Sequence, residues 1–329
     1  MKLVAAWIGG VAVVIAISAY AALELSPWPA ALVYRWFMNH GGEALSQAMQ
    51  KHVPAGVASR LDERYDADDP DALLDVYFPA SAARPLPTIV WVHGGGFLAG
   101  HKGLVAPYLK ILAARGYTTV ALGYSLAPAR QYPTPVRQAN AALAYLEKNA
   151  ERLHVDPERF FLAGDSAGAQ VAAQLANVIS VASYASTIGI SPSIHRRQLR
   201  GVILHCGMYD PGLARFDGPF GHLMRTIVWS YSGRKAFGDE ARPPELSIPR
   251  VVTAEFPPAF ISAGNADPLL AHSKALADAL AARGVKLDSL FFPEDYRPRL
   301  PHEYQFNLDT GAGREALEHT VRFLRATAY

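Results

Sequence analysis

The stretch Gly164-Asp165-Ser166-Ala167-Gly168 decides the fold prediction, because it lies directly between a strand-like and a helix-like segment. The apolar run Phe-Phe-Leu-Ala at 160–163 precedes it, and helix-forming residues follow at 170–176. A serine at the apex of a strand, tight turn and helix forms a nucleophile elbow, a strained turn that exposes the hydroxyl and leaves no space for neighbouring side chains. The two glycines meet that demand. The stretch therefore predicts a nucleophilic Ser166 at the edge of a sheet.

Outward from this turn, strand-length apolar runs alternate with helical patterns. The runs are 73–78, 88–92, 118–122, 160–163, 202–206, 259–262 and 287–292, and the helical patterns are 136–149, 167–182, 272–283 and 314–326. This alternation predicts an α/β fold, with a mostly parallel central sheet and helices on both faces.

The composition favours one domain of catalytic size with insertions. Of the 329 residues 50% are hydrophobic and 18% are charged, so the chain can bury a large core. The net charge is only +2, and no cluster of Lys and Arg is interleaved with aromatic residues, so no nucleic-acid partner is expected. The only cysteine, Cys206, excludes an intramolecular disulfide, and its apolar surroundings predict a buried strand residue.

The N-terminal segment 1–25 is predicted to be a transmembrane anchor. No charged residue occurs from Leu3 to Leu23. About 20 such residues span a bilayer, whereas a signal-peptide core has about 7 to 15. The alternative is a signal that is removed near Ala19-Tyr20-Ala21, which would give a secreted or periplasmic protein. With Lys2 before the span and Arg35 the first cation after it, the positive-inside rule predicts an extracytoplasmic catalytic domain.

Two further segments are predicted to form a cap. Residues 26–60 have an amphipathic helical pattern and are expected to be N-terminal cap helices, preceding a catalytic domain at 61–329. Within that domain about 211–257 contains no strand-length apolar run and reads as an insertion. Its apolar residues at helical spacing are Phe220, Leu223, Ile227 and Tyr231. Ordinary helix packing explains that spacing equally well. In an open parallel sheet, however, ligands bind beyond the carboxyl ends of the strands, and the insertion begins there, which favours a lid.

A serine hydroxyl needs a base to take its proton and an acid to orient that base. Asp267 follows the predicted strand 259–262, and His302 follows the predicted strand 287–292. The three residues occur in the order Ser, acid, His, each after its own strand at the same sheet edge, so they predict a catalytic triad. The rival candidates are Asp288, Asp295, His272 and His319, each within or beside a predicted helix or strand and less suitably placed.

The loop His93-Gly94-Gly95-Gly96-Phe97 follows the predicted strand 88–92. Without side chains to obstruct them, its amides can face the oxyanion of a tetrahedral intermediate. Gly94-x-Gly96-x-x-Ala99 also fits a dinucleotide-binding fingerprint, which expects an acidic residue about 20 positions further on. Residues 113–122 contain none, so no nucleotide site is predicted.

Together these motifs resemble the hormone-sensitive-lipase-like branch of the α/β-hydrolase fold. The matching stretches are 93–97, 164–168, Asp267-Pro268-Leu269 and His302-Glu303-Tyr304, with Tyr124-Ser125-Leu126-Ala127-Pro128 and Tyr132-Pro133 between them. The resemblance covers the chain from about Leu73 to its C-terminus. An anchor before such a domain is similar to the membrane-anchored, arylacetamide-deacetylase-like esterases.

The resemblance implies a role for each matching residue. It implies Ser166 as nucleophile, Asp267 as acid and His302 as base, with the amides of Gly95, Gly96 and Ala167 as the oxyanion hole, and it requires neither metal nor organic cofactor. Two departures occur near the site. Ala169 stands where the elbow usually continues with glycine, and residues 270–272 lack the further acidic residue that often follows the catalytic aspartate. They make it unsafe to carry a substrate over from another family member.

The expected activity is that of a serine carboxylesterase that hydrolyses carboxylic esters of small to medium apolar acyl or aryl groups through an acyl-enzyme. The expected partners are a small-molecule ester and, through the N-terminal segment, a membrane. An amidase or deacetylase, or a lactonase, could use the same triad and remains the alternative. A non-catalytic ligand-binding protein of this fold would be expected to lack a triad residue, and all three are present.

Overall fold

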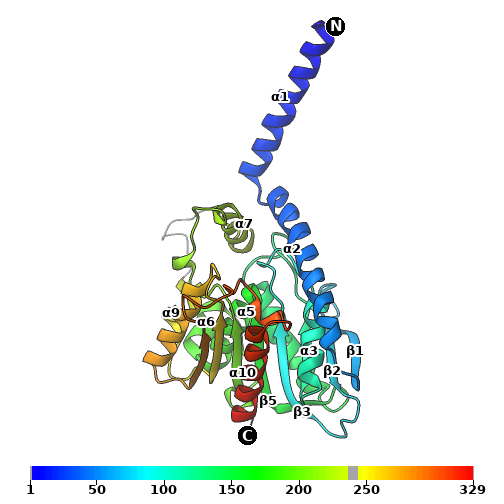
Figure 1. Ribbon diagram of the computed structural model, residues 1–329, viewed down its shortest axis with the longest axis vertical. Coiled ribbons are helices and arrows are strands. Elements are labelled where there is room, and N and C mark those ends of the chain that lie inside the picture. Colours follow the sequence, from blue (N-terminus) through cyan, green and yellow to red (C-terminus); the bar gives the residue numbers. More distant parts are fainter. Residues whose placement is uncertain (1, 236–243, 329) are drawn as a thin grey trace.

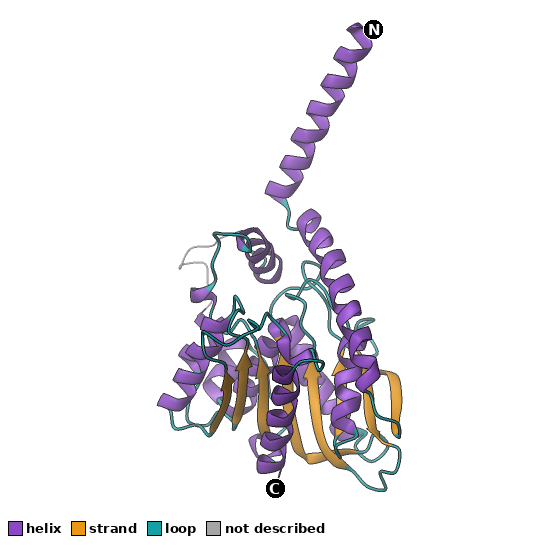
Figure 2. Cartoon of the chain, viewed as in Figure 1, coloured by secondary structure: helices purple, strands orange, loops and turns teal. Residues whose placement is uncertain are grey.

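The computed structural model describes residues 2–235 and 244–328, and within them a single twisted sheet lies between two layers of helices (Figure 1, Figure 2). The strands are β1 (Val57–Arg64), β2 (Leu73–Pro79), β3 (Leu86–Val92), β4 (Thr118–Leu122), β5 (Val155–Asp165), β6 (Leu199–His205), β7 (Ala259–Ala263) and β8 (Leu287–Phe291). Their order across the sheet is β1-β2-β4-β3-β5-β6-β7-β8. Only the pairs β1/β2 and β2/β4 are antiparallel, so the predicted mostly parallel sheet is confirmed.

The helices are α1 (Lys2–Leu25), α2 (Trp28–Met49), α3 (Ala106–Ala113), α4 (Thr134–Lys148), α5 (Ser166–Ser180), α6 (Ala182–Ile188), α7 (Gly221–Ser232), α8 (Ile248–Val251), α9 (Leu270–Ala282) and α10 (Gly311–Thr327). Short 3-10 helices are η1 (Gln50–His52), η2 (Lys102–Val105), η3 (Arg196–Gln198), η4 (Pro211–Leu213), η6 (Pro244–Leu246) and η7 (Tyr304–Phe306). The α/β alternation read from the sequence thus holds through most of the chain.

The sheet separates two cores, because successive strand residues point to opposite faces. In β3 the side chains of Ile89 and Trp91 join the core beneath α3 and α10, whereas Val90 and Val92 join the core beneath α4, α5 and α9. Burial on both faces explains why the central strands are continuous apolar runs rather than alternating ones. It also holds the carboxyl ends of β3, β5, β7 and β8 at one rigid edge.

Three expectations from the sequence are wrong in detail. The helical region expected over 26–60 ends at His52, and β1 follows as a strand, which the pattern missed because its residues are mostly exposed and polar. The helix expected over 167–182 is two helices, α5 and α6. Cys206 is buried as expected, but it lies one residue beyond β6, in a left-handed conformation with φ 46°.

The cap segments lie over the carboxyl edge of the sheet. In the insertion, α7 packs on the glycine loop: the ring of Tyr231 stacks on Phe97 with centroids 3.7 Å apart, and Ile227 lies against Gly96. From the other side α2 runs along the same loop, while α1 extends away from the body (Figure 1). Residues 236–243 of the expected insertion lie outside the described residues.

Among residues 2–235 and 244–328, no single helix is long and apolar enough to cross a membrane. Two pairs of consecutive helices pass the same test only when taken together. They are Val13–Leu25 with Trp28–His52, bent by 84°, and α5 with α6, bent by 119°. The transmembrane anchor therefore stays a prediction.

Candidate active site

The turn between β5 and α5 has the geometry of a nucleophile elbow. Ser166 begins α5 with φ 51°, a left-handed conformation that a residue with a side chain rarely adopts. A Cβ atom on Gly164 would lie 2.5 Å from the carbonyl carbon of Gly168, and one on Gly168 would lie 2.0 Å from the carbonyl oxygen of Val92. Both positions are therefore closed to any side chain, as the motif predicts.

The structure brings the three predicted triad residues together from three strand ends. The Nε2 atom of His302 lies 3.0 Å from Oγ of Ser166. On the other side of the ring, Nδ1 lies 2.9 Å and 3.0 Å from the two carboxylate oxygens of Asp267. Oδ1 of Asp267 also accepts the amide of Leu269 at 2.7 Å, which fixes the orientation of the carboxylate. The arrangement lets His302 take a proton from Ser166 while Asp267 holds the imidazole.

The surroundings of His302 tune its basicity. Burial of the ring lowers its pKa, but the neighbouring Cys206 and the hydrogen bond to Asp267 raise it, and the net pKa lies well above its ordinary value. The same burial raises the pKa of the Cys206 thiol. A buried carboxylate beside an imidazole stabilises the imidazolium, so Asp267 favours the charged form of His302.

The glycine loop lies beside Ser166 and has the backbone freedom that an oxyanion hole requires. Gly95 and Gly96 have φ values of 110° and 59°, and a Cβ atom on Gly95 would lie 2.1 Å from the carbonyl oxygen of Ala99. Within residues 2–235 and 244–328, the amides of Gly95 and Gly96 are paired with no protein acceptor. Ala167 is the second residue of α5, so its amide adds the positive end of a helix dipole. These groups can stabilise a developing negative charge.

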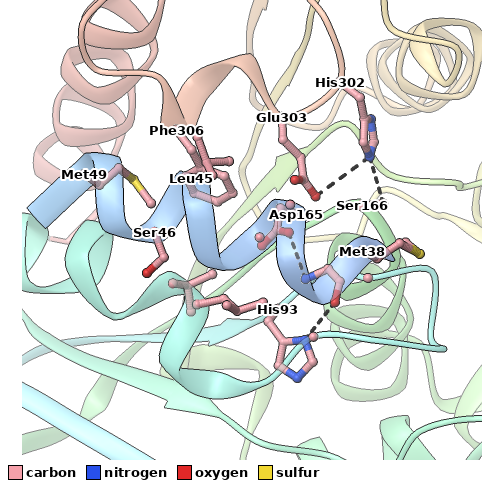
Figure 3. A pocket seen from close by; sticks show the side chains of 17 residues that line it. Met38, Leu45, Ser46, Met49, His93, Asp165, Ser166, His302, Glu303 and Phe306 are labelled. Atoms are coloured by element: carbon pink, nitrogen blue, oxygen red, sulfur yellow. Dashed lines mark hydrogen bonds and ion pairs between the residues drawn. The ribbon is translucent and has the colours of Figure 1, made fainter. Parts of the chain in front are cut away.

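A pair of carboxyl groups that the sequence analysis missed flanks the glycine loop, residues 93–97. Asp165 is buried, and its carboxyl oxygens accept the Trp91 indole at 2.7 Å and the Gly94 amide at 2.8 Å. Glu303 lies beside it, with Oε1 3.9 Å from Nε2 of His302. Burial, together with the charge of Glu303 and a hydrogen bond to it, raises the pKa of Asp165 well above its ordinary value. Asp165 and Glu303 thus lie side by side next to the ring of His302 (Figure 3).

Asp165 lies inside the serine motif and Glu303 follows the predicted base, so both were visible as neighbours of predicted site residues. Their pairing was not visible, because it depends on the turns at the ends of β5 and β8 meeting in space. Cys206 was missed for the same reason.

A cavity of about 250 Å³ opens at Ser166 between the inner side of α2 and the glycine loop (Figure 3). Its apolar lining includes Met38, Leu45 and Met49 from α2, Leu104 and Val105 from η2, and Phe306 from η7. His302 and Glu303 border it on the polar side. An apolar pocket with a few convergent polar groups is the usual form of a small-molecule site.

The rival candidates lie elsewhere. His319 and Asp288 are 3.8 Å apart and form a contact of their own. The buried His272 lies 3.3 Å from the amide of Asp210, and Asp295 is exposed on a loop. Among the described residues, one group has spacing suited to a metal ion, namely Cys206, Asp267 and His302. Two of its members are already bonded to each other in the triad arrangement.

Comparison with known proteins agrees with the geometry. Residues 89–297 match a protein family described as having the alpha/beta hydrolase fold. The chain is 25% identical to an acetyl esterase of Salmonella paratyphi B over 268 residues, which covers 78% of this chain and 76% of that protein. It is similar to the crystal structure of esterase B from Lactobacillus rhamnosis, with a TM-score of 0.78 and 25% identity over 91% of this chain and 96% of that one.

The fold is shared more widely than the sequence. An esterase from Pyrobaculum calidifontis has a TM-score of 0.72 at 22% identity, covering 91% of this chain and 94% of that one. At that sequence identity the structural similarity supports the fold alone.

Proposed function

The chain belongs to the alpha/beta hydrolase fold family and hydrolyses carboxylic esters, and on that premise we propose that it is a serine carboxylesterase with Ser166 as its nucleophile. The observation that carries the proposal is the continuous hydrogen-bonded arrangement of Ser166, His302 and Asp267 beside a glycine loop with unpaired amides. An acetyl esterase and an esterase among its relatives support the reaction class.

The reaction would follow from these contacts. Nε2 of His302 removes the proton from Ser166, and Oγ attacks the carbonyl carbon of the ester. Asp267 stabilises the imidazolium, which then gives its proton to the departing alcohol. A water molecule, activated by the same histidine, releases the acid from the acyl-enzyme. The carbonyl oxygen would lie against the amides of Gly95, Gly96 and Ala167, where each lost donor typically costs about 3 to 4 kcal/mol of transition-state stabilisation.

The proposed substrates are esters with small to medium apolar acyl or aryl groups. The lining of the cavity by methionine, leucine and phenylalanine side chains supports an apolar group, and its volume of about 250 Å³ supports a modest size. The related esterase B has been crystallised with a phosphonate described as a C4-C4 tributyrin inhibitor, which is consistent with short acyl chains.

The N-terminal segment is proposed to attach the protein to a membrane, with the catalytic domain on the extracytoplasmic side. Its uncharged run from Leu3 to Leu23 supports this, as does the exposure of Trp7, Val14 and Ile17 on a helix that extends away from the body (Figure 1). Large apolar side chains on an isolated helix are costly to leave in water.

The test of catalysis is a rate series on aryl esters of increasing acyl length, with an aryl amide alongside. Replacing the nucleophile in Ser166→Ala should lower kcat by roughly 10⁴ to 10⁶-fold, because the oxyanion hole and binding alone retain little catalysis. The matched control is Ser273→Ala, which removes a buried serine hydroxyl on α9 outside the cavity. Undiminished turnover by Ser166→Ala would refute the mechanism, and a preference for the amide would refute the ester assignment.

A further inference from the structure

The outer face of α2 exposes a continuous apolar stripe. Trp28, Leu32, Val33, Trp36 and Phe37 are four, one, three and one residues apart, a spacing that places them on one half of the helix surface, and Trp36 and Phe37 are 56% and 61% exposed. We call these five residues the α2 stripe. Scattered apolar residues are ordinary on a protein surface, but a contiguous set containing two tryptophans and a phenylalanine marks an interaction site.

The stripe is apolar only along the half of α2 that adjoins α1. Further along the same side the exposed residues include His40, Glu43 and Gln47, which are polar, and Ala44, whose side chain is a single methyl group, so no large apolar side chain continues the stripe. The one charged residue between Trp28 and Phe37 is Arg35, and its guanidinium turns inward to donate to the carbonyls of Leu98 at 2.5 Å and Ala127 at 2.9 Å. The stripe itself therefore carries no charge.

The position of α1 indicates what covers the stripe. Only Ser26 and Pro27 separate α1 from α2, so the stripe begins a few residues after the uncharged run from Leu3 to Leu23 and after Glu24, which pairs with Lys235. The segments Val13–Leu25 and Trp28–His52 meet at 84°. If α1 enters a bilayer close to its normal, α2 lies nearly parallel to the membrane plane. In Figure 1 the catalytic body lies on the side of α2 opposite to the direction in which α1 extends.

We propose that the α2 stripe docks on a lipid membrane, with α2 lying flat in the interface. The proposal rests on the membrane attachment proposed above for α1. Tryptophan side chains favour the water interface of a bilayer, where the apolar ring is buried and the indole N–H stays hydrated. A helix with one apolar face lies in this layer at a depth of about 5 to 10 Å. The loss of the apolar stripe beyond Phe37 limits the docking to the part of α2 next to α1.

Docking would bring the catalytic machinery against the lipid surface. The inner side of α2 lines the cavity through Met38, Leu45 and Met49. It also holds the segment that follows the glycine loop, because Arg35 donates to the carbonyl of Leu98 and Oδ1 of Asn39 accepts the Gly100 amide at 2.8 Å. One helix would therefore contact lipid on one side and the substrate cavity on the other. The substrates best placed to reach Ser166 are esters that partition into membranes.

The experiment places a thiol-reactive, environment-sensitive fluorophore at single cysteines in the full chain, reconstituted in vesicles of neutral phosphatidylcholine. The native Cys206 is buried, and the unsubstituted chain serves as the labelling blank. Trp36→Cys and Leu32→Cys report on the stripe, and Ile15→Cys reports on α1. The matched control is Leu61→Cys, an apolar residue of β1 that is 57% exposed and lies outside the stripe.

Docking predicts blue-shifted emission at positions 15, 32 and 36, and quenching there by lipids that carry a nitroxide in the upper acyl chain. The label at 61 should behave as in water. High salt should leave the signals unchanged, because the stripe is uncharged. If the label at 15 lies in lipid but the labels at 32 and 36 lie in water, α1 is attached to the membrane and the docking of α2 is refuted. If all labels lie in water, both the docking of α2 and the attachment of α1 are refuted. Shielding of 32 and 36 without lipid, with a doubled molecular mass, would assign the stripe to a second copy and overturn lipid docking. Hydrolysis of a soluble aryl ester, measured in the same samples, tests the esterase activity separately.

Discussion

Two helices that differ in burial, α5 and α2, border the cavity, α5 through Ser166 alone and α2 through much of the apolar lining. Fourteen of the fifteen residues of α5 are buried, whereas buried residues in the 22-residue α2 are confined to Ala31, Ser46 and Met49. The backbone of α5 touches the strand ends so closely that no side chain fits at Gly168, but nothing lies within 4 Å of a Cβ atom added at Gly41 of α2. Ser166, the proposed nucleophile, thus lies on the sterically constrained helix, whereas α2 has exposed surface and also lines the cavity.

The largest expected effect tests how far the reactivity of Ser166 depends on Asp267, which follows a different strand. Asp267→Asn should lower kcat/KM by about 10⁴-fold, because the amide cannot hold the His302 ring in the required tautomer. The acid limb of the pH profile should shift as well. His302 acts as a base only when neutral, so activity rises as pH passes its raised pKa, and removal of the carboxylate should move this limb to lower pH.

The measurement for Asp267→Asn is kcat/KM against pH on one aryl ester, with the thermal midpoint as a control for folding. An unchanged acid limb in a folded Asp267→Asn protein would show that Asp267 does not set the basicity of His302.

The next test compares the two helices directly. In Gly168→Ala, the new Cβ would lie 2.0 Å from the carbonyl oxygen of Val92 and 2.5 Å from that of His93, both backbone atoms that cannot turn aside. The free energy of unfolding should fall by about 3 kcal/mol or more, and activity should be lost. In Gly41→Ala the free energy of unfolding should instead rise by about 0.5 to 1 kcal/mol, because alanine favours a helix interior and meets no neighbour.

Denaturant unfolding of the two glycine variants beside the wild type measures this contrast. Equal effects at both positions would remove the distinction between a constrained α5 and a tolerant α2.

The smallest expected effect tests whether α2 supports the glycine loop through the carbonyls of Leu98 and Ala127. Arg35→Met keeps most of the side-chain volume but leaves the carbonyls of Leu98 and Ala127 without their donor. We expect kcat/KM to fall about tenfold, which is about 1.4 kcal/mol, through kcat rather than KM, since the loop acts on the transition state. Arg35→Lys should recover part of the loss by donating to one carbonyl. A rise in KM with kcat unchanged, or no recovery by lysine, would count against this role.

How much the sequence could predict differs between the same two regions. The two glycines at 164–168 lie between an apolar run and a helical pattern, so the turn, the strand before it and the helix after it were all predictable. Because Ser166, Asp267 and His302 each follow a predicted strand, their meeting at one edge of the sheet was predictable as well. Around α2 the same reasoning was weaker, because an amphipathic pattern predicts a helix but not its end, and β1 was hidden by exposed polar residues at a sheet edge.

By itself, the amino-acid sequence determined the local geometry, namely the glycines at closed positions, the apolar strands and the residue types of a triad, since steric exclusion and periodicity act over a few neighbouring residues. Only the tertiary structure decided which groups meet. It brought Glu303 beside Asp165, Cys206 beside His302 and Arg35 beneath the glycine loop, and it left the apolar side of α2 uncovered. Such contacts join residues far apart in the chain, and they exist only once the sheet has aligned its strand ends and the cap helices have packed over them.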